Sequence, residues 1–250
     1  MSMIQQNAEP AGASRAGATG VTPVGSRYAA ASVTGALLVI LVASGPLAAG
    51  AARVAAVTAL YGLVAVIIGL LMRRTYPHDA LGLCNLVTLL RLALATCLVA
   101  PLLAGGQADW AVFAVAAVAL GLDGLDGWLA RRQGLVSAFG ARFDMEVDAA
   151  LGLILALNAL AAGSAGALVL LLGVPRYAFV AAGLALPWMR RPLPNRAGRK
   201  VACVVQIAAL IAVQAPILPP GPAGGIVTLA VLGLGWSFGR DVLWLWRRRS

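Results

Sequence analysis

The chain has 250 residues, of which 61% are hydrophobic and only 11% are charged, and its mean hydropathy is +0.89. This composition excludes an ordinary soluble domain and is typical of helical proteins that cross a membrane several times. The net charge of +10 does not indicate nucleic-acid binding, because the basic residues lie between apolar segments, as the positive-inside rule describes. The sequence therefore predicts an all-α, polytopic integral membrane protein without a nucleic-acid partner.

The first 27 residues are rich in Ala, Gly, Ser and Pro and contain no compact apolar stretch. We expect a disordered tail there, and no signal peptide. The cysteines Cys84, Cys97 and Cys203 have no metal-ligand spacing, and their odd number argues against a disulfide framework. They are interpreted as small core residues.

Eight apolar stretches are long enough to cross a hydrocarbon core of about 30 Å. They cover approximately residues 31–50, 54–72, 83–104, 108–130, 142–162, 165–187, 200–217 and 223–245. Glycine and proline, which break helices, occur in the connections, for example at residues 44–46 and 105–107. We expect about eight transmembrane helices.

Most arginines fall on one side of the membrane if these eight spans alternate in direction. They lie at residues 73–74, 131–132, 190–200 and 247–249. The positive-inside rule then places both termini and these basic loops in the cytoplasm. We expect a multi-pass protein of a bacterial-type inner (plasma) membrane.

Acidic residues are concentrated in one short segment. Five of the nine lie within residues 123–148: Asp123, Asp126, Asp144, Glu146 and Asp148. On helices, three- and four-residue spacings place Asp123 with Asp126, and Asp144 with Asp148, on shared faces. The predicted topology brings both pairs to the cytoplasmic membrane edge, where clustered carboxylates indicate a functional site.

Four neighbouring aspartates cannot all be ionised without a compensating charge. A hard divalent cation supplies that charge, and carboxylates without His or Cys favour Mg²⁺ or Mn²⁺. Gly127 and Ala130 allow a ligand to approach the helix, and Arg131 can face phosphate oxygens. The pattern favours a lipid-linked phosphate substrate, with two metals on the phosphoryl oxygens and one carboxylate deprotonating a hydroxyl.

Two other interpretations of the aspartates stay open. A pair near a helix end can be a cap or a topology device. A carboxylate-coupled membrane transporter or lipid scramblase also has intramembrane carboxylates, usually nearer the midplane than these. Such a protein would have no transferase activity.

The spacing Asp-x2-Asp-Gly-x2-Ala-Arg-x8-Gly-x3-Asp-x3-Asp resembles the signature of the CDP-alcohol phosphatidyltransferases. All eight fixed positions match: Asp123, Asp126, Gly127, Ala130, Arg131, Gly140, Asp144 and Asp148. Upstream, Asn85-x2-Thr88-x2-Arg91 is similar to the family's first-helix motif near the nucleotide. The resemblance covers residues 80–245 as a six-helix core. We therefore expect a cytoplasmic tail (1–27), an added transmembrane hairpin (28–75) and the phosphatidyltransferase membrane domain (76–250).

The resemblance implies transfer of a phosphatidyl group from CDP-diacylglycerol to an alcohol, with release of CMP. It implies that Asp123, Asp126 and Asp144 bind two Mg²⁺ or Mn²⁺ ions with a share from Asp148, which is also the general base. The residues that it implies for CDP-lipid binding are Asn85, Thr88, Gly127, Ala130, Arg131 and Gly140. It also implies a homodimer. Asn85 and Thr88 alternatively satisfy only the polar groups of a helix N-terminus.

The acceptor site is indicated by basic residues only. Arg176 interrupts an apolar stretch, and Arg199 and Lys200 follow an arginine-rich loop. These residues favour a phosphorylated polyol acceptor such as glycerol 3-phosphate or an inositol phosphate. Serine, inositol or another small alcohol stays open, and Arg176 alternatively snorkels to the interface.

Overall fold

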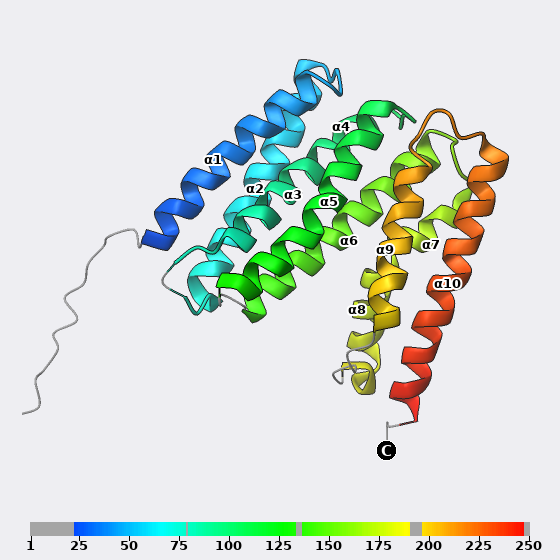
Figure 1. The fold of residues 1–250 in the computed structure, drawn as a ribbon. Coiled ribbons are helices and arrows are strands. Elements are labelled where there is room, and N and C mark those ends of the chain that lie inside the picture. Colours follow the sequence, from blue (N-terminus) through cyan, green and yellow to red (C-terminus); the bar gives the residue numbers. More distant parts are fainter. Residues whose placement is uncertain (1–22, 79, 134–136, 191–196, 248–250) are drawn as a thin grey trace, which may run out of the picture.

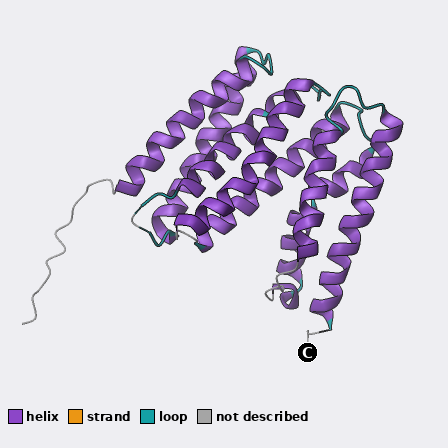
Figure 2. Ribbon diagram, viewed as in Figure 1, coloured by secondary structure: helices purple, strands orange, loops and turns teal. Residues whose placement is uncertain are grey.

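The computed structural model describes residues 23–78, 80–133, 137–190 and 197–247. Within these ranges every regular element is a helix and none is a strand (Figure 2). In chain order the elements are α1 (Pro23–Ser44), α2 (Ala51–Thr75), α3 (Leu83–Cys97), α4 (Val99–Leu102), α5 (Trp110–Gln133), α6 (Ala138–Ala161), η1 (Ala167–Val169), α7 (Leu170–Gly173), α8 (Pro175–Ala185), η2 (Pro187–Arg190), α9 (Ala197–Ala212) and α10 (Pro220–Trp246). The all-α prediction is confirmed.

Helix α3 is the central element of the fold. Its neighbours include α1 and α2 on one side and α5 and α6 on the other. In Figure 1 the hairpin α1–α2 lies at one edge, and α9 and α10 lie at the opposite edge. In the most apolar 18 residues of the span Leu83–Leu102, which comprises α3 and α4, about 72% of the residues are buried, against 22% for α1 and 17% for α2. Polar residues on α3 are therefore held by protein rather than by lipid.

Among the described residues, four helices are long and apolar enough to cross a membrane, and a bent pair can add a fifth. The four are Val24–Ser44, Ala51–Thr75, Leu83–Leu102 and Pro220–Trp246. The bent pair, Ala167–Gly173 and Pro175–Ala185, changes direction by 65°. A prolyl nitrogen has no hydrogen to donate, so the first position of α8 is a natural place for this break. The lengths show a membrane protein, while the count of eight spans stays a prediction.

The first helix lies earlier in the chain than the sequence indicated. It begins at Pro23, inside the segment assigned to the tail, and ends at Ser44 rather than near residue 50. The Tyr28 hydroxyl donates a buried hydrogen bond of 2.7 Å to the Ala65 carbonyl and so joins the start of α1 to α2. After Ser44 the chain turns, with Ala48 at φ 46°.

Buried amides link the helices of the core. Asn158 and Gln214 are both fully buried. The Asn158 amide donates to the Leu98 carbonyl at 2.8 Å, and the Gln214 amide donates to the Leu155 carbonyl at 2.9 Å. In lipid such bonds fix one helix against another, because the alternative is an unsatisfied polar group. They hold α6, the helix that carries two of the predicted site aspartates, between α3 and α9.

Candidate active site

Three of the predicted metal ligands converge in space. Asp123 lies just past the middle of α5, and Asp144 and Asp148 lie one turn apart in the first half of α6. One carboxylate oxygen from each lies within 4.8 Å of the others. Their side chains are 32%, 35% and 40% exposed, in that order. The cluster is thus open on one side, as a site that receives a ligand must be.

The donor set fits a hard divalent cation. Oxygen ligands lie about 2.0–2.1 Å from Mg²⁺, so opposite ligands of one ion are about 4.2 Å apart. The observed limit of 4.8 Å between the carboxylate oxygens is only slightly wider. Among the described residues no histidine or cysteine belongs to this cluster, which favours Mg²⁺ or Mn²⁺ over zinc.

Arg91 of α3 lies among the three carboxylates. One guanidinium nitrogen, Nη2, pairs with Asp123 at 3.0 Å and also with Asp148, and Nη1 pairs with Asp144. The Arg91 side chain is only 1% exposed. A buried guanidinium needs paired anions, and the carboxylates need a positive charge. The two requirements are met together where the middle of α3 packs against α5 and α6.

This position of Arg91 was not predicted. The sequence shows Arg91 three residues after Thr88 and indicates only that it belongs near a nucleotide. The signal that could have found it is the lack of another arginine or lysine in the apolar segment 83–104. A single cation within a buried helix has to meet acids elsewhere in the chain.

Asn85 and Gly140 also come together. The position that a Cβ on Gly140 would occupy is 3.2 Å from the Asn85 Oδ1 and 3.2 Å from the Ser137 hydroxyl. Ser137 caps α6 by accepting a hydrogen bond of 3.0 Å from the Gly140 N–H. A glycine at this place therefore lets the start of α3 approach the start of α6. Both residues belong to the predicted CDP-lipid set.

The polar groups at the start of α3 have protein partners. The Asn85 amide donates to the Tyr76 hydroxyl at 3.1 Å, and the Thr88 hydroxyl donates to the Cys84 carbonyl at 3.0 Å. Asn85 and Thr88 are each 3% exposed. Burial raises the pKa of the Tyr76 phenol, although hydrogen bonds from the Gly82 N–H and the Asn85 amide lower it in part. Tyr76 therefore stays a neutral hydroxyl at physiological pH.

The structure does not describe the side chains of several predicted site residues. Asp126, Gly127, Ala130 and Arg131 belong to α5, and Arg199 and Lys200 belong to α9, but their side chains lie outside the described part of the structure. Their helical backbone is compatible with the predicted site.

Arg176 has a partner that the sequence did not indicate. At the start of α8 it pairs with Glu146, an acid of α6 between Asp144 and Asp148 for which the sequence suggested no role. The two side chains are 30% and 53% exposed. Glu146 thus belongs to a neighbouring ion pair rather than to the carboxylate cluster.

Fold and site together define a helical membrane protein in which a buried arginine of α3 compensates a carboxylate cluster of α5 and α6. The family model of the CDP-alcohol phosphatidyltransferases matches residues 81–239, well over half of the chain, and the chain belongs to this family. No match was found among curated proteins or among solved structures. The matched region begins just before α3 and leaves α1 and α2 outside it.

Membership defines the general reaction. The chain is an enzyme of phospholipid biosynthesis that transfers substituted phosphate groups, and its family moves a phosphatidyl group from a CDP-alcohol to an acceptor alcohol in a membrane. The family uses a divalent metal, and the cluster of Asp123, Asp144 and Asp148 can bind one.

Proposed function

We propose that the chain transfers the phosphatidyl group of CDP-diacylglycerol to a hydroxyl of a small polar alcohol and releases CMP. The observation that supports this most directly is the convergence of Asp123, Asp144 and Asp148 from two helices around one arginine. A transporter or scramblase would not need such a cluster beside the Asn85-x2-Thr88-x2-Arg91 motif, which resembles the family's motif near the nucleotide.

The metal ligands in this proposal are Asp123, Asp126 and Asp144, with a share from Asp148. Two Mg²⁺ or Mn²⁺ ions held there would supply positive charge to the pyrophosphate oxygens of the CDP-lipid. Arg91 is in direct contact with three of these four side chains and so sets their positions and their net charge before any ligand binds.

Asp148 is the proposed general base. Its side chain is 40% exposed, the most open of the three that converge, so an acceptor hydroxyl can reach it. The hydroxyl proton passes to the Asp148 carboxylate as the alcohol oxygen forms a bond to the phosphatidyl phosphorus. The bond from that phosphorus to the oxygen bridging to CMP breaks, and CMP leaves with the electron pair.

The proposed CDP-lipid residues belong to α3, α5 and α6. They are Asn85, Thr88, Gly127, Ala130, Arg131 and Gly140. The 3.2 Å approach between Asn85 and the Gly140 position supports this assignment, because it joins the two helices where the nucleotide would lie.

For the acceptor we propose a phosphorylated polyol, such as glycerol 3-phosphate or an inositol phosphate, bound by Arg176, Arg199 and Lys200. Arg176 is paired with Glu146, which lies two residues from both Asp144 and Asp148 on α6, so its charge is already near the proposed site. An anionic acceptor would have to exchange with Glu146 for this arginine.

The proposed arrangement in the membrane has eight spans, with residues 28–75 as an added hairpin, residues 76–250 as the catalytic domain and residues 1–27 as a cytoplasmic tail. We place the active site and both termini on the cytoplasmic side of the plasma membrane, and we propose a homodimer. The basic last turn of α2, with Arg73 and Arg74, supports this orientation.

The test is CMP release from CDP-diacylglycerol by purified protein with Mg²⁺ or Mn²⁺ and a panel of alcohols and phosphorylated polyols. Asp148→Asn should lower the rate about 10²–10⁴-fold, and a chelator should abolish it. Asp109→Asn is the matched control, because Asp109 is an exposed acid at the opposite end of α5 that accepts a bond from the Ala111 N–H. Protein that neither releases CMP nor binds CDP-diacylglycerol would refute the proposal.

A further inference from the structure

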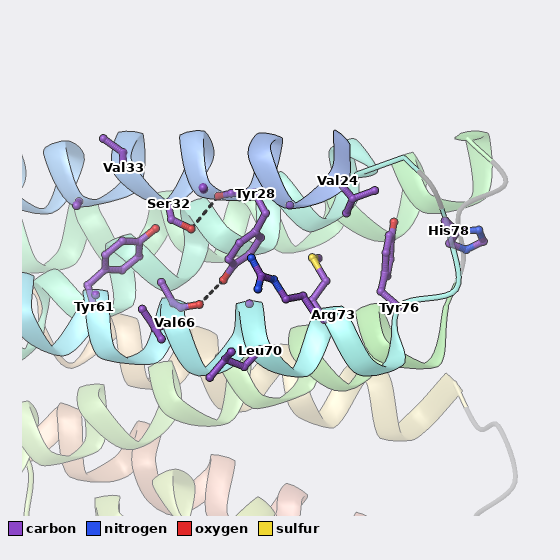
Figure 3. A pocket seen from close by; sticks show the side chains of 17 residues that line it. Val24, Tyr28, Ser32, Val33, Tyr61, Val66, Leu70, Arg73, Tyr76 and His78 are labelled. Carbon is purple, nitrogen blue, oxygen red and sulfur yellow. Dashed lines mark hydrogen bonds between the residues drawn. The ribbon is translucent and has the colours of Figure 1, made fainter. Parts of the chain in front are cut away.

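A groove of about 810 Å³ lies between α1 and α2, in the hairpin outside the family region. Its lining is mostly apolar, and many of the lining residues are small (Figure 3). Ala29 and Ala36 lie on α1, and Gly62, Ala65 and Gly69 lie on α2. The small residues hollow this face of the hairpin, and the floor of the groove is formed in part by the Tyr28 ring, which lies against Gly69 and is bonded to the Ala65 carbonyl.

The groove has about the length of one leaflet of a bilayer. Along α2 it extends from Tyr61 to Arg73, which at 1.5 Å per residue is about 18 Å. Half of the hydrocarbon core of a membrane is about 15 Å thick. An acyl chain that starts at the membrane surface can therefore lie along the full groove.

The end at the membrane surface is polar and basic. Arg73, in the last turn of α2, lines the groove together with Tyr76 and His78 just beyond the helix. Figure 3 shows the Arg73 side chain running back along the groove rather than away from it. None of the described residues that line the groove is acidic, and Arg73 makes no ion pair with any described residue. The charge at this end is thus available to an anion.

The groove is separate from the carboxylate site. All its lining residues come from α1, α2 and the segment just after α2, and none comes from α3, α5 or α6. Tyr76 stands between the two sites. Its ring packs edge-on against His78 and Phe139, with centroids 5.4 and 5.8 Å away, and its hydroxyl is bonded to Asn85.

We propose that this groove binds one anionic diacyl phospholipid of the surrounding bilayer, as a site distinct from that of the CDP-lipid. One acyl chain lies along the open part of the groove, beside Ala29, Gly62 and Val66, and the phosphate lies on Arg73. An arginine near the membrane surface contributes about 1 kcal/mol to binding of an anionic lipid, which corresponds to about fivefold in affinity.

Two substitutions test the groove and each has a matched control. A Cβ on Gly62 would meet nothing within 4 Å, so Gly62→Leu adds a bulky side chain to the groove from an unobstructed position. Gly233 on α10 is exposed and equally open, so Gly233→Leu adds the same side chain elsewhere on a lipid-facing helix. Arg73→Gln removes the groove cation, whereas Arg74→Gln removes its neighbour, which does not line the groove.

The measurement is native mass spectrometry of the full chain, released from nanodiscs of phosphatidylcholine with 10% phosphatidylglycerol. We expect one retained phosphatidylglycerol on the wild type and on both controls, with added CDP-diacylglycerol not displacing it. Gly62→Leu should lose it, and Arg73→Gln should bind it about fivefold more weakly.

Four results would overturn the proposal. They are retention of the lipid by both groove variants, equal loss in the controls, equal retention of phosphatidylcholine, and displacement by CDP-diacylglycerol. A dimer that dissociates on Gly62→Leu would instead identify the groove as a surface between two copies of the chain. CMP release is not used as a readout, so failure here is distinct from failure of the transferase proposal.

Discussion

Replacing Arg91 with glutamine removes a buried cation that contacts Asp123, Asp144 and Asp148. The glutamine amide can still donate a hydrogen bond, so the change tests charge more than shape. Without a divalent ion, the variant leaves three carboxylates within 4.8 Å of one another. Arg91→Lys keeps the charge but has no planar guanidinium to contact three carboxylates. Its stability in a chelator should therefore lie between that of the wild type and that of Arg91→Gln.

The size of the effect follows from these distances. At an effective dielectric of about 20, two unit charges 4.8 Å apart repel by about 3.5 kcal/mol. Solvent reduces this repulsion, since each carboxylate is about one third exposed. Breaking a buried ion pair costs about 3–5 kcal/mol, which we take as the loss for Arg91→Gln in a chelator. At about 2–4 °C per kcal/mol, Tm should fall by about 6–20 °C.

Although Arg91→Gln should be less stable than the wild type in a chelator, we expect it to bind divalent ions more tightly. In the wild type an incoming ion meets a site that already contains one positive charge, whereas in Arg91→Gln it does not. We expect Mn²⁺ to bind the variant about tenfold or more tightly, and its thermal shift with Mn²⁺ to be larger. The measurements are a Mn²⁺ titration followed by electron paramagnetic resonance, and thermal unfolding with chelator and with Mn²⁺. An unchanged Tm in chelator, or weaker Mn²⁺ binding, would refute this reasoning.

Three other changes have predictable effects. Gly106→Ala should lower the Tm more than Gly105→Ala. Both glycines have a positive φ, 80° at Gly106 and 94° at Gly105, so both substitutions strain the backbone. Only a Cβ on Gly106 would also meet atoms at the end of α6, at 2.6–2.7 Å. Asn158→Leu should cost about 1–3 kcal/mol in thermal unfolding, because a buried carbonyl at the end of α3 loses its donor. Gly140→Ala should weaken CDP-diacylglycerol binding with little change in Tm, because the added methyl lies 3.2 Å from the Asn85 Oδ1. Unchanged affinity in a lipid-binding titration would contradict the assignment of Gly140.

The sequence predicted the convergence of the aspartates because their spacing and their position between apolar segments are local properties. Asp144 and Asp148 share a helix face in any α-helix, and short connections force neighbouring spans together. Arg91 was missed because its partners Asp144 and Asp148 are 53 and 57 residues away. Only the packing of α3 against α5 and α6 brings them together, and hydrophobic periodicity does not define that packing.

The sequence also predicted one continuous span at residues 165–187, where the structure has a 65° bend. The proline at position 175 was a visible signal for a break. Its consequence was not visible: the bend places Arg176 at the start of α8, within reach of Glu146 on α6. Ion pairs between helices depend on such angles, which spacing within one segment does not determine.

The added hairpin is tied to the enzyme domain through Tyr76. Its hydroxyl accepts hydrogen bonds from the Asn85 amide at 3.1 Å and the Gly82 N–H at 3.4 Å, and donates to the Ala80 carbonyl at 3.0 Å. Because burial raises the pKa of Tyr76, this three-way link persists across the physiological range. A displacement of the last turn of α2 would therefore move Asn85 at the proposed nucleotide site. Lipid bound beside Arg73 and the CDP-lipid bound beside Asn85 would then be separate ligands that act on two sides of one tyrosine.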